Sequence, residues 1–251
     1  MKKVFRKIHR WLGLAMALQI MAWMGSGLYF AIFPIETIRG EHLTVEAAAL
    51  ESEDFDVMIP VSGAWATVAG GLNGVGTLQA VSLHSAMGRS WYRFSGSTES
   101  GTFARLVNAH NGDLLPFLDA GQVRQLAESS LAVKGQVESI ELVEHAAPGA
   151  EFRGRQLPLW RVAYSEPESL HLYIDGWTGE VVARRTTRWR IFDFLWMLHI
   201  MDFDDRDDFN TPLLQVAAVL GLLVAMTGLV FWAMTTRLFR GRKTRRANQT
   251  V

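Results

Sequence analysis

The 251-residue sequence contains no cysteine, and neither end of the chain carries an acidic residue. Without cysteine, neither a disulfide framework nor a thiolate metal site can form. All 25 acidic residues lie between Glu36 and Asp208, and the segments outside this stretch carry only basic charges. Five Lys or Arg residues precede the stretch and six follow it, which leaves 14 basic against 25 acidic residues in the middle. The formal net charge of zero therefore conceals three zones of alternating sign.

Charge is also missing from two long apolar runs, Trp11–Phe33 and Pro212–Met234. A helix of about 20 residues crosses the roughly 30 Å hydrocarbon layer, so both runs are long enough to span a membrane. The first run could also be a secretory signal peptide, but such apolar regions are only about 7–15 residues long and end at a small-x-small cleavage site. This run ends at Pro34 without one, so we expect an uncleaved anchor. Thr211 is expected to cap the second helix, with Pro212 at its first position.

The basic ends predict the orientation of the two spans, because Lys and Arg next to a spanning helix stay on the cytoplasmic side. We therefore expect a protein of the bacterial inner membrane, with both termini cytoplasmic and the acidic middle in the periplasm. Nucleic-acid binding is the other interpretation of the basic tail that follows the second span. We do not predict it, because topology already explains these charges, which would lie near anionic lipid headgroups.

Small residues recur within both spans, where they let helix backbones approach closely. Glutamines in each span would seek a polar partner there. Both features predict close packing of the spans, within one chain or across a homodimer. The residues concerned are Gly13, Ala17 and Gln19 in the first span, and Gln215, Gly221, Ala225 and Gly228 in the second.

The segment between the spans contains a duplicated pattern of strands. A strand with an aromatic residue comes first in each copy, at Trp91–Phe94 and at Leu157–Val162. A second strand, a turn and a third strand follow, at Ala104–Leu114 and at Leu172–Val182. The pattern predicts two small antiparallel sheets.

The turns and helices of the two copies support this interpretation. Each turn contains Asn or Asp and then a glycine, Gly112 or Gly179, which supplies the positive φ of a tight turn. These glycines lie 67 residues apart, which sets the repeat period. Helical sequence precedes each copy, weakly at Val61–Val68 and clearly at Asp119–Val133, and Gln136–Glu144 alternates as a strand does. The predicted unit is a helix followed by a small antiparallel sheet.

The second copy resembles the PepSY domain, with its Pro-x-Trp strand and a hairpin that reads Tyr-Ile-Asp-x-x-Thr-Gly-Glu-Val. The ends of the chain resemble the PepSY-associated membrane-helix family. Larger relatives in this family look like four-helix reductases, whereas a chain with only two spans resembles the short branch of the family. The matching segments are Pro158–Trp160, Tyr173–Val181, His9–Leu14, Leu198–His199, Gly221 and Thr227–Trp232.

We therefore predict an α+β periplasmic region with two PepSY-like units of helix plus antiparallel sheet, flanked by two transmembrane helices. The predicted parts are a cytoplasmic basic tail (1–10), a first span (11–34), a periplasmic linker (35–59), PepSY-like units (60–118 and 119–186), an interfacial helix with an acidic loop (187–211), a second span (212–235) and a second cytoplasmic basic tail (236–251).

Two histidines are candidate ligands of a b-type haem, because some relatives resemble haem-bearing ferric-siderophore reductases with histidines on membrane helices. His9 lies where the first span meets the cytoplasm, and His199 lies in a short apolar segment on the other side. This topology puts them roughly 30 Å apart, whereas two axial ligands of one haem lie a few ångströms apart. A haem site would therefore need a homodimer that supplies the same histidine twice. The blander interpretation is a pair of amphipathic residues at the interfaces.

An acidic run follows His199 and could bind a hard cation through its carboxylate oxygens. It lacks the glycine and closing glutamate of a calcium loop, and a solvated acidic loop that caps the second span is the alternative. The run comprises Asp202, Asp204, Asp205, Asp207 and Asp208.

No catalytic constellation is recognisable in the soluble part, since the other histidines lack ligand spacing. The leading functional hypothesis is a non-enzymatic membrane protein that presents its PepSY-like units to the periplasm and binds or regulates a protein partner. PepSY domains resemble protease propeptide inhibitors. This resemblance implies a protein or peptide ligand that binds through strand or groove contact. The alternative is a haem-dependent electron-transfer subunit for ferric iron or siderophore reduction in iron uptake.

Overall fold

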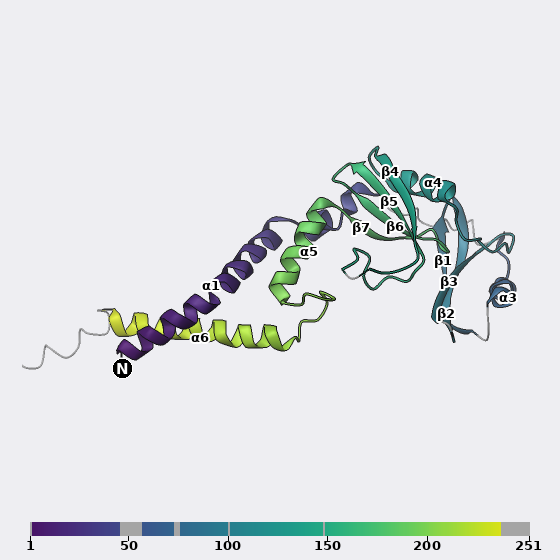
Figure 1. The fold of residues 1–251 in the computed structure, drawn as a ribbon. Coiled ribbons are helices and arrows are strands. Elements are labelled where there is room, and N and C mark those ends of the chain that lie inside the picture. Colours follow the sequence, from purple (N-terminus) through teal and green to yellow (C-terminus); the bar gives the residue numbers. More distant parts are fainter. Residues whose placement is uncertain (1, 46–56, 73–75, 100, 148, 237–251) are drawn as a thin grey trace, which may run out of the picture. The chain divides into compact units, whose positions relative to one another are not determined.

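The computed structural model describes residues 2–45, 57–72, 76–99, 101–147 and 149–236. It has a mixed α+β fold, with an apolar helix at each end of the chain and two antiparallel sheets between them (Figure 1). The six basic residues of the closing tail lie outside the described residues. The chain divides into two compact units: Met1–Pro34 with Ile191–Val251, and Ile35–Arg190.

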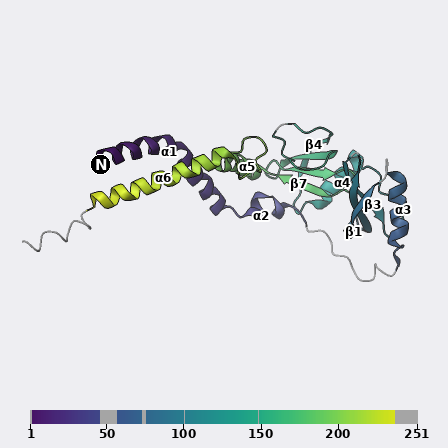
Figure 2. The same cartoon turned by 90° about the horizontal axis from the view of Figure 1, so that it is seen from below.

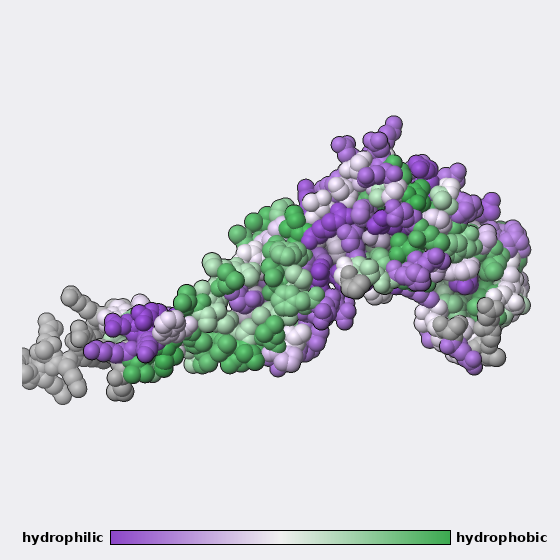
Figure 3. Space-filling view, viewed as in Figure 1, coloured by the Kyte–Doolittle hydropathy of each residue, from purple (hydrophilic) through white to green (hydrophobic). Residues whose placement is uncertain are grey.

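The terminal helices are α1 (Lys2–Ile32) and α6 (Pro212–Thr235), both long and apolar enough to cross a membrane. Their exposed surfaces are largely hydrophobic (Figure 3). Helix α6 begins as predicted, because the hydroxyl of Thr211 accepts a hydrogen bond from the Leu214 N–H at 3.2 Å. Helix α5 (Thr187–Ile200) is 14 residues long, about 21 Å, which is too short to span the hydrocarbon layer.

The first sheet has the order β1-β2-β3 and follows a helix, as predicted. Helix α3 covers one of its faces through Ala64 and Val68, which are buried against Phe94 and Val107. The β1–β2 turn contains Met87 with φ of 52°, followed by a glycine. The elements up to this sheet are α2 (Ile35–Ile38), a short 3-10 helix (Glu41–Leu43), α3 (Val61–Gly71), β1 (Thr77–Ala86), β2 (Arg89–Thr98) and β3 (Gly101–Asn108).

The second sheet has the order β4-β5-β6-β7 and also follows a helix. Asp119 caps that helix in a reciprocal arrangement with Gln122, which confirms the predicted start. The helix lies between the two sheets (Figure 2), and its Val123 and Ala127 share a core with Trp91 of the first sheet and Val162 of the second. The elements are α4 (Ala120–Ser130), β4 (Gln136–Val143), β5 (Leu159–Glu166), β6 (His171–Asp175) and β7 (Val181–Arg185).

The predicted turns of the two sheets have matching hydrogen bonds. The side chain of Asn108 accepts from the N–H groups two and three residues later, at 2.9 and 3.2 Å, and that of Asp175 does the same at 2.8 and 2.9 Å. Gly112 and Gly179 have φ of 80° and 70°. Both turns thus use the Asx geometry that the sequence predicts.

The prediction of a third strand in the first copy is wrong. After the turn at Gly112, only Leu114 forms an isolated bridge, with Val107, and no third strand follows among the described residues of this copy. The N–H of Leu115 still donates to the backbone oxygen of Leu106 at 2.8 Å. The next residue, Pro116, has no N–H to continue a ladder, so pairing ends there.

Candidate functional site

His9 lies at the contact between the two terminal helices. Its Nδ1 lies 3.0 Å from the hydroxyl oxygen of Thr227 on α6. A Cβ placed on Gly228 would lie 3.1 Å from Cε1 of the imidazole, so the absence of a side chain at this glycine lets the histidine approach. His9 therefore joins α1 to α6.

His199 joins α5 to α1 by two hydrogen bonds. Its Nδ1 lies 2.7 Å from the hydroxyl oxygen of Ser26, a residue with no exposed surface. Its backbone oxygen accepts a 2.7 Å hydrogen bond from the indole N–H of Trp23. Trp196 stacks on the imidazole, with the ring planes 3° apart. Burial lowers the pKa of His199, so the neutral imidazole is favoured.

The two histidines contact α1 at positions far apart. Ser26, the partner of His199, lies 17 residues beyond His9 on α1, which is about 26 Å along a helix. A haem with two axial histidines needs both nitrogens on one iron, so the residues of one chain do not fit such a site. Nothing in the described residues favours the haem interpretation.

The acidic run forms a turn that is organised by Asp202. Its carboxylate accepts hydrogen bonds from the backbone N–H groups of Asp204 at 3.3 Å and of Asp207 and Asp208 at 3.0 Å. These bonds, above all that from Asp208, hold the pKa of Asp202 below its usual range. Asp202, the first carboxylate of the predicted cation site, thus already accepts hydrogen bonds from the backbone of its own loop.

Arg206, which interrupts the acidic run, joins this turn to α5. Arg206 pairs with Asp193 of α5, and the indole of Trp196 donates to the Arg206 backbone oxygen at 3.1 Å. Within the described part of the chain, no three His, Asp or Glu side chains come together in a way that could hold a metal ion. The metal site therefore stays a prediction from the sequence.

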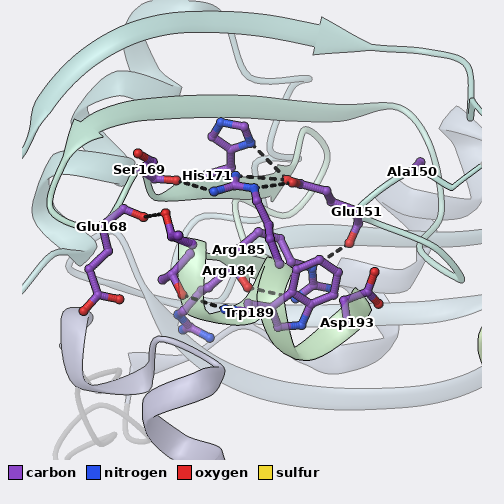
Figure 4. Close-up of polar contacts among 12 residues, drawn as sticks. Ala150, Glu151, Glu168, Ser169, His171, Arg184, Arg185, Trp189 and Asp193 are labelled. Carbon is purple, nitrogen blue, oxygen red and sulfur yellow. Dashed lines mark hydrogen bonds and ion pairs between the residues drawn. The ribbon is translucent and has the colours of Figure 1, made fainter. Parts of the chain in front are cut away.

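A cluster that sequence reasoning missed surrounds Glu151, in the loop between β4 and β5 (Figure 4). Arg190 at the start of α5 donates to Oε1 at 2.6 Å. On β6, His171 Nδ1 lies 3.0 Å from Oε2, and the Tyr173 hydroxyl donates to the same oxygen at 3.1 Å. Arg185 of β7 donates to the Glu151 backbone oxygen at 2.6 Å. One residue thus ties a loop, two strands and a helix together.

The electrostatics of this cluster favour the charged form of Glu151. Burial alone would raise the pKa of its carboxyl, but hydrogen bonds from His171 and Arg190 outweigh it and lower the pKa to about 2. Burial, together with the nearby Glu151 carboxylate, raises the pKa of the Tyr173 hydroxyl. The cluster therefore holds a fixed negative charge and a hydroxyl that stays protonated. Its members lie up to 39 residues apart on separate elements, so no sequence spacing signals it.

Strand β1 has the clearest capacity for contact among the described elements of the unit Ile35–Arg190. It forms an edge of the first sheet, and seven of its ten residues are exposed, including Leu78 at 37% and Val81 at 39%. It contains no Lys, Arg, Asp or Glu, whereas the edge strands β3, β4 and β7 each contain at least one. Charged residues on edges normally block pairing with another chain. This edge lacks that protection.

A groove of about 530 Å³ begins at the tip of the same hairpin. Its floor is apolar, and Arg89 is the one charged residue among those that line it. The lining residues are Met87, Arg89, Trp91, Leu115, Leu118, Gln122, Gln125, Leu126 and Ser129.

Comparison with known proteins identifies the family to which this architecture belongs. The family model described as PepSY-associated TM region matches residues 6–250, nearly the whole chain. The chain belongs to this family. No curated protein and no solved structure gave a match.

The PepSY-associated TM segments that carry the resemblance contact one another in the membrane-helix unit. The opening motif meets the closing motif where His9 bonds Thr227. The middle motif meets α1, because Gln19 donates to the backbone oxygen of Leu198 at 3.1 Å. A Cβ on Gly221 would lie 3.3 Å from the ring of Trp23. Three motifs that are far apart in sequence thus pack as one helical unit.

Proposed function

We propose that this protein is an inner-membrane anchor that holds two PepSY-like units in the periplasm, where they bind an extended segment of another polypeptide. The units correspond to residues 60–118 and 119–186, each a helix followed by an antiparallel sheet. The basic termini support cytoplasmic ends, since Lys and Arg resist translocation. The family match and the two candidate spans support membrane anchoring.

The uncharged, exposed edge of β1 carries this proposal. A polypeptide that adds a strand there would satisfy the outward backbone groups of β1 by main-chain hydrogen bonds. Its side chains would contact the exposed Leu78 and Val81, and the groove beside Arg89 lies within reach of the hairpin tip. The partner is either a different protein or a second copy of this chain.

Site-specific cross-linking tests the proposal in the full-length protein in native membranes. A photo-reactive residue at position 78 should form a covalent adduct with a second polypeptide, which mass spectrometry then identifies. Val81→Lys places a charge on the edge and should reduce the adduct several-fold, whereas Val81→Thr should retain it because threonine is neutral and favours strands.

The control probe replaces Val133, which is 45% exposed in the segment after α4. It should give no adduct. Equal cross-linking at positions 78 and 133, or an adduct that Val81→Lys leaves intact, would contradict strand addition at β1.

A further inference from the structure

Arginines gather around the indole of Trp189 at the start of α5. The guanidinium carbon of Arg185 lies 4.0 Å from the ring centroid, and that of Arg153 lies 5.9 Å from it. Arg155 follows two residues after Arg153 in the same loop. The hydrogen bond from Arg185 to the Glu151 backbone oxygen holds its guanidinium in place over the indole. The result is a fixed cationic surface built on an aromatic ring.

Positive charge exceeds negative charge at this surface. The carboxylate of Glu151 is already bound by Arg190 and His171. The pKa of Arg185 falls to about 10, first because it is buried and then because Arg155 repels its charge, despite the nearby carboxylate. An anion that entered the cluster would relieve this repulsion.

Helix α5, which carries Trp189, changes from a basic to a largely apolar sequence directly after Arg190. After Arg190, α5 continues as the apolar segment Ile191–Ile200, in which Ile191 and Phe194 are 45% and 55% exposed. Tryptophan at such a change from polar to apolar surface is typical of a membrane–water interface. Along the chain, only two residues separate the end of helix α1 at Ile32 from the start of the unit Ile35–Arg190.

Arg153 and Arg185 lie over Trp189, and Arg155 repels the charge of Arg185. We propose that Arg153, Arg155 and Arg185 together bind the phosphate of an anionic phospholipid headgroup. A guanidinium presents paired donors that match two phosphate oxygens, and the indole suits the boundary between headgroup and acyl chain. Three guanidinium groups would repel the choline of a zwitterionic lipid, so the site selects an anionic headgroup. The inference does not depend on strand addition at β1.

Native mass spectrometry of the full-length protein in detergent provides the test. The protein is offered equal amounts of phosphatidylglycerol and phosphatidylcholine, and the fraction that retains each lipid is measured. The variant is Arg153→Gln with Arg155→Gln, which leaves Arg185 and the Glu151 cluster in place. The control is Arg124→Gln with Arg161→Gln, which removes the same charge from two surface ion pairs. Circular dichroism of both variants confirms that the fold is kept.

We expect the wild type and the control to retain phosphatidylglycerol in preference to phosphatidylcholine. The variant should bind phosphatidylglycerol about fivefold more weakly for each arginine removed. Equal retention by variant and control would overturn the proposal, because the binding would then come from other basic residues. Displacement of the lipid by inorganic phosphate at a similar concentration would also overturn it, since the site would then accept free phosphate rather than a lipid.

Discussion

Glu151 links several elements of the unit Ile35–Arg190. It accepts hydrogen bonds from β6 and from the first turn of α5, and its backbone oxygen holds Arg185 of β7. A charge-assisted bond of this kind is stronger than a neutral one, and its loss leaves the partner guanidinium without a counter-charge. The first turn of α5 is thus held to the second sheet partly through one carboxylate, alongside the bonds of Thr187 to Glu168 and of Arg190 to Ser169.

This arrangement predicts a pH-dependent stability that Glu151→Gln removes. The folded pKa of about 2 lies below the ordinary value of 4.5, so the stabilisation is complete above pH 4.5 and is lost as the pH falls toward 2. The shift corresponds to an upper limit of about 3 kcal/mol in the free energy of unfolding.

Thermal unfolding of the full-length protein in detergent, followed by near-ultraviolet circular dichroism, measures the effect. Glu151→Gln should lower the midpoint at neutral pH and flatten its dependence on acid. Glu141→Gln breaks the half-exposed pair with Arg161 and should have little effect. If both variants unfold like the wild type, the proposed tie does not exist.

Residue roles could be predicted where the partners are close in sequence. The caps at Asp119 and Thr211 and the turns at Asn108 and Asp175 follow from side chains that bond to backbone groups a few positions away. The Glu151 cluster could not be predicted in this way, because tertiary folding brings its members together.

At the scale of elements, the glycines of the two spans divide into two kinds. Gly221 and Gly228 of α6 lie against Trp23 and His9 of α1, as expected for close helix packing. Gly13 of α1, which shows the same sequence signal, has no heavy atom within 4 Å of its Cβ position. Spacing alone does not indicate which small residues lie at a helix contact, because it does not reveal how each helix is rotated.

This difference predicts that Gly228→Val destabilises the helix pair and Gly13→Val does not. Added side-chain atoms at position 228 would force the imidazole of His9 away and break its bond to Thr227, at a cost of about 1–3 kcal/mol. Tryptophan fluorescence during thermal unfolding in micelles reports the loss. Equal effects of the two substitutions would show that α1 and α6 do not pack through this face.

Strands could be predicted best where characteristic turn residues flank them in the sequence. The strands β2, β3, β5, β6 and β7 lie in the segments that the repeat pattern marks. Strand β1 was not predicted, because its neutral sequence carries no clean alternation, and Pro116 ended a predicted third strand. The strand with the weakest signal is thus the one to which we assign partner binding.

At the scale of the whole molecule, the account depends on which side of the membrane each unit faces. In the proposed topology, the two apolar helices cross the membrane in opposite directions, so that the ends of the chain lie on one side and the middle on the other. The charge pattern predicts a cytoplasmic location for both ends, because five basic residues precede the first span and six follow the second. The proposed partner binding in the periplasm and the proposed lipid binding at the periplasmic surface of the membrane both require this orientation.

The absence of cysteine makes a direct measurement possible, since any thiol introduced into the chain is unique. Val133→Cys and Val4→Cys each place it at an exposed site, in the middle of the chain and near its start. A membrane-impermeant maleimide applied to intact cells should label Cys at position 133, and should label Cys at position 4 only after the membrane is opened. Labelling of position 4 in intact cells, with protection of position 133, would contradict the account.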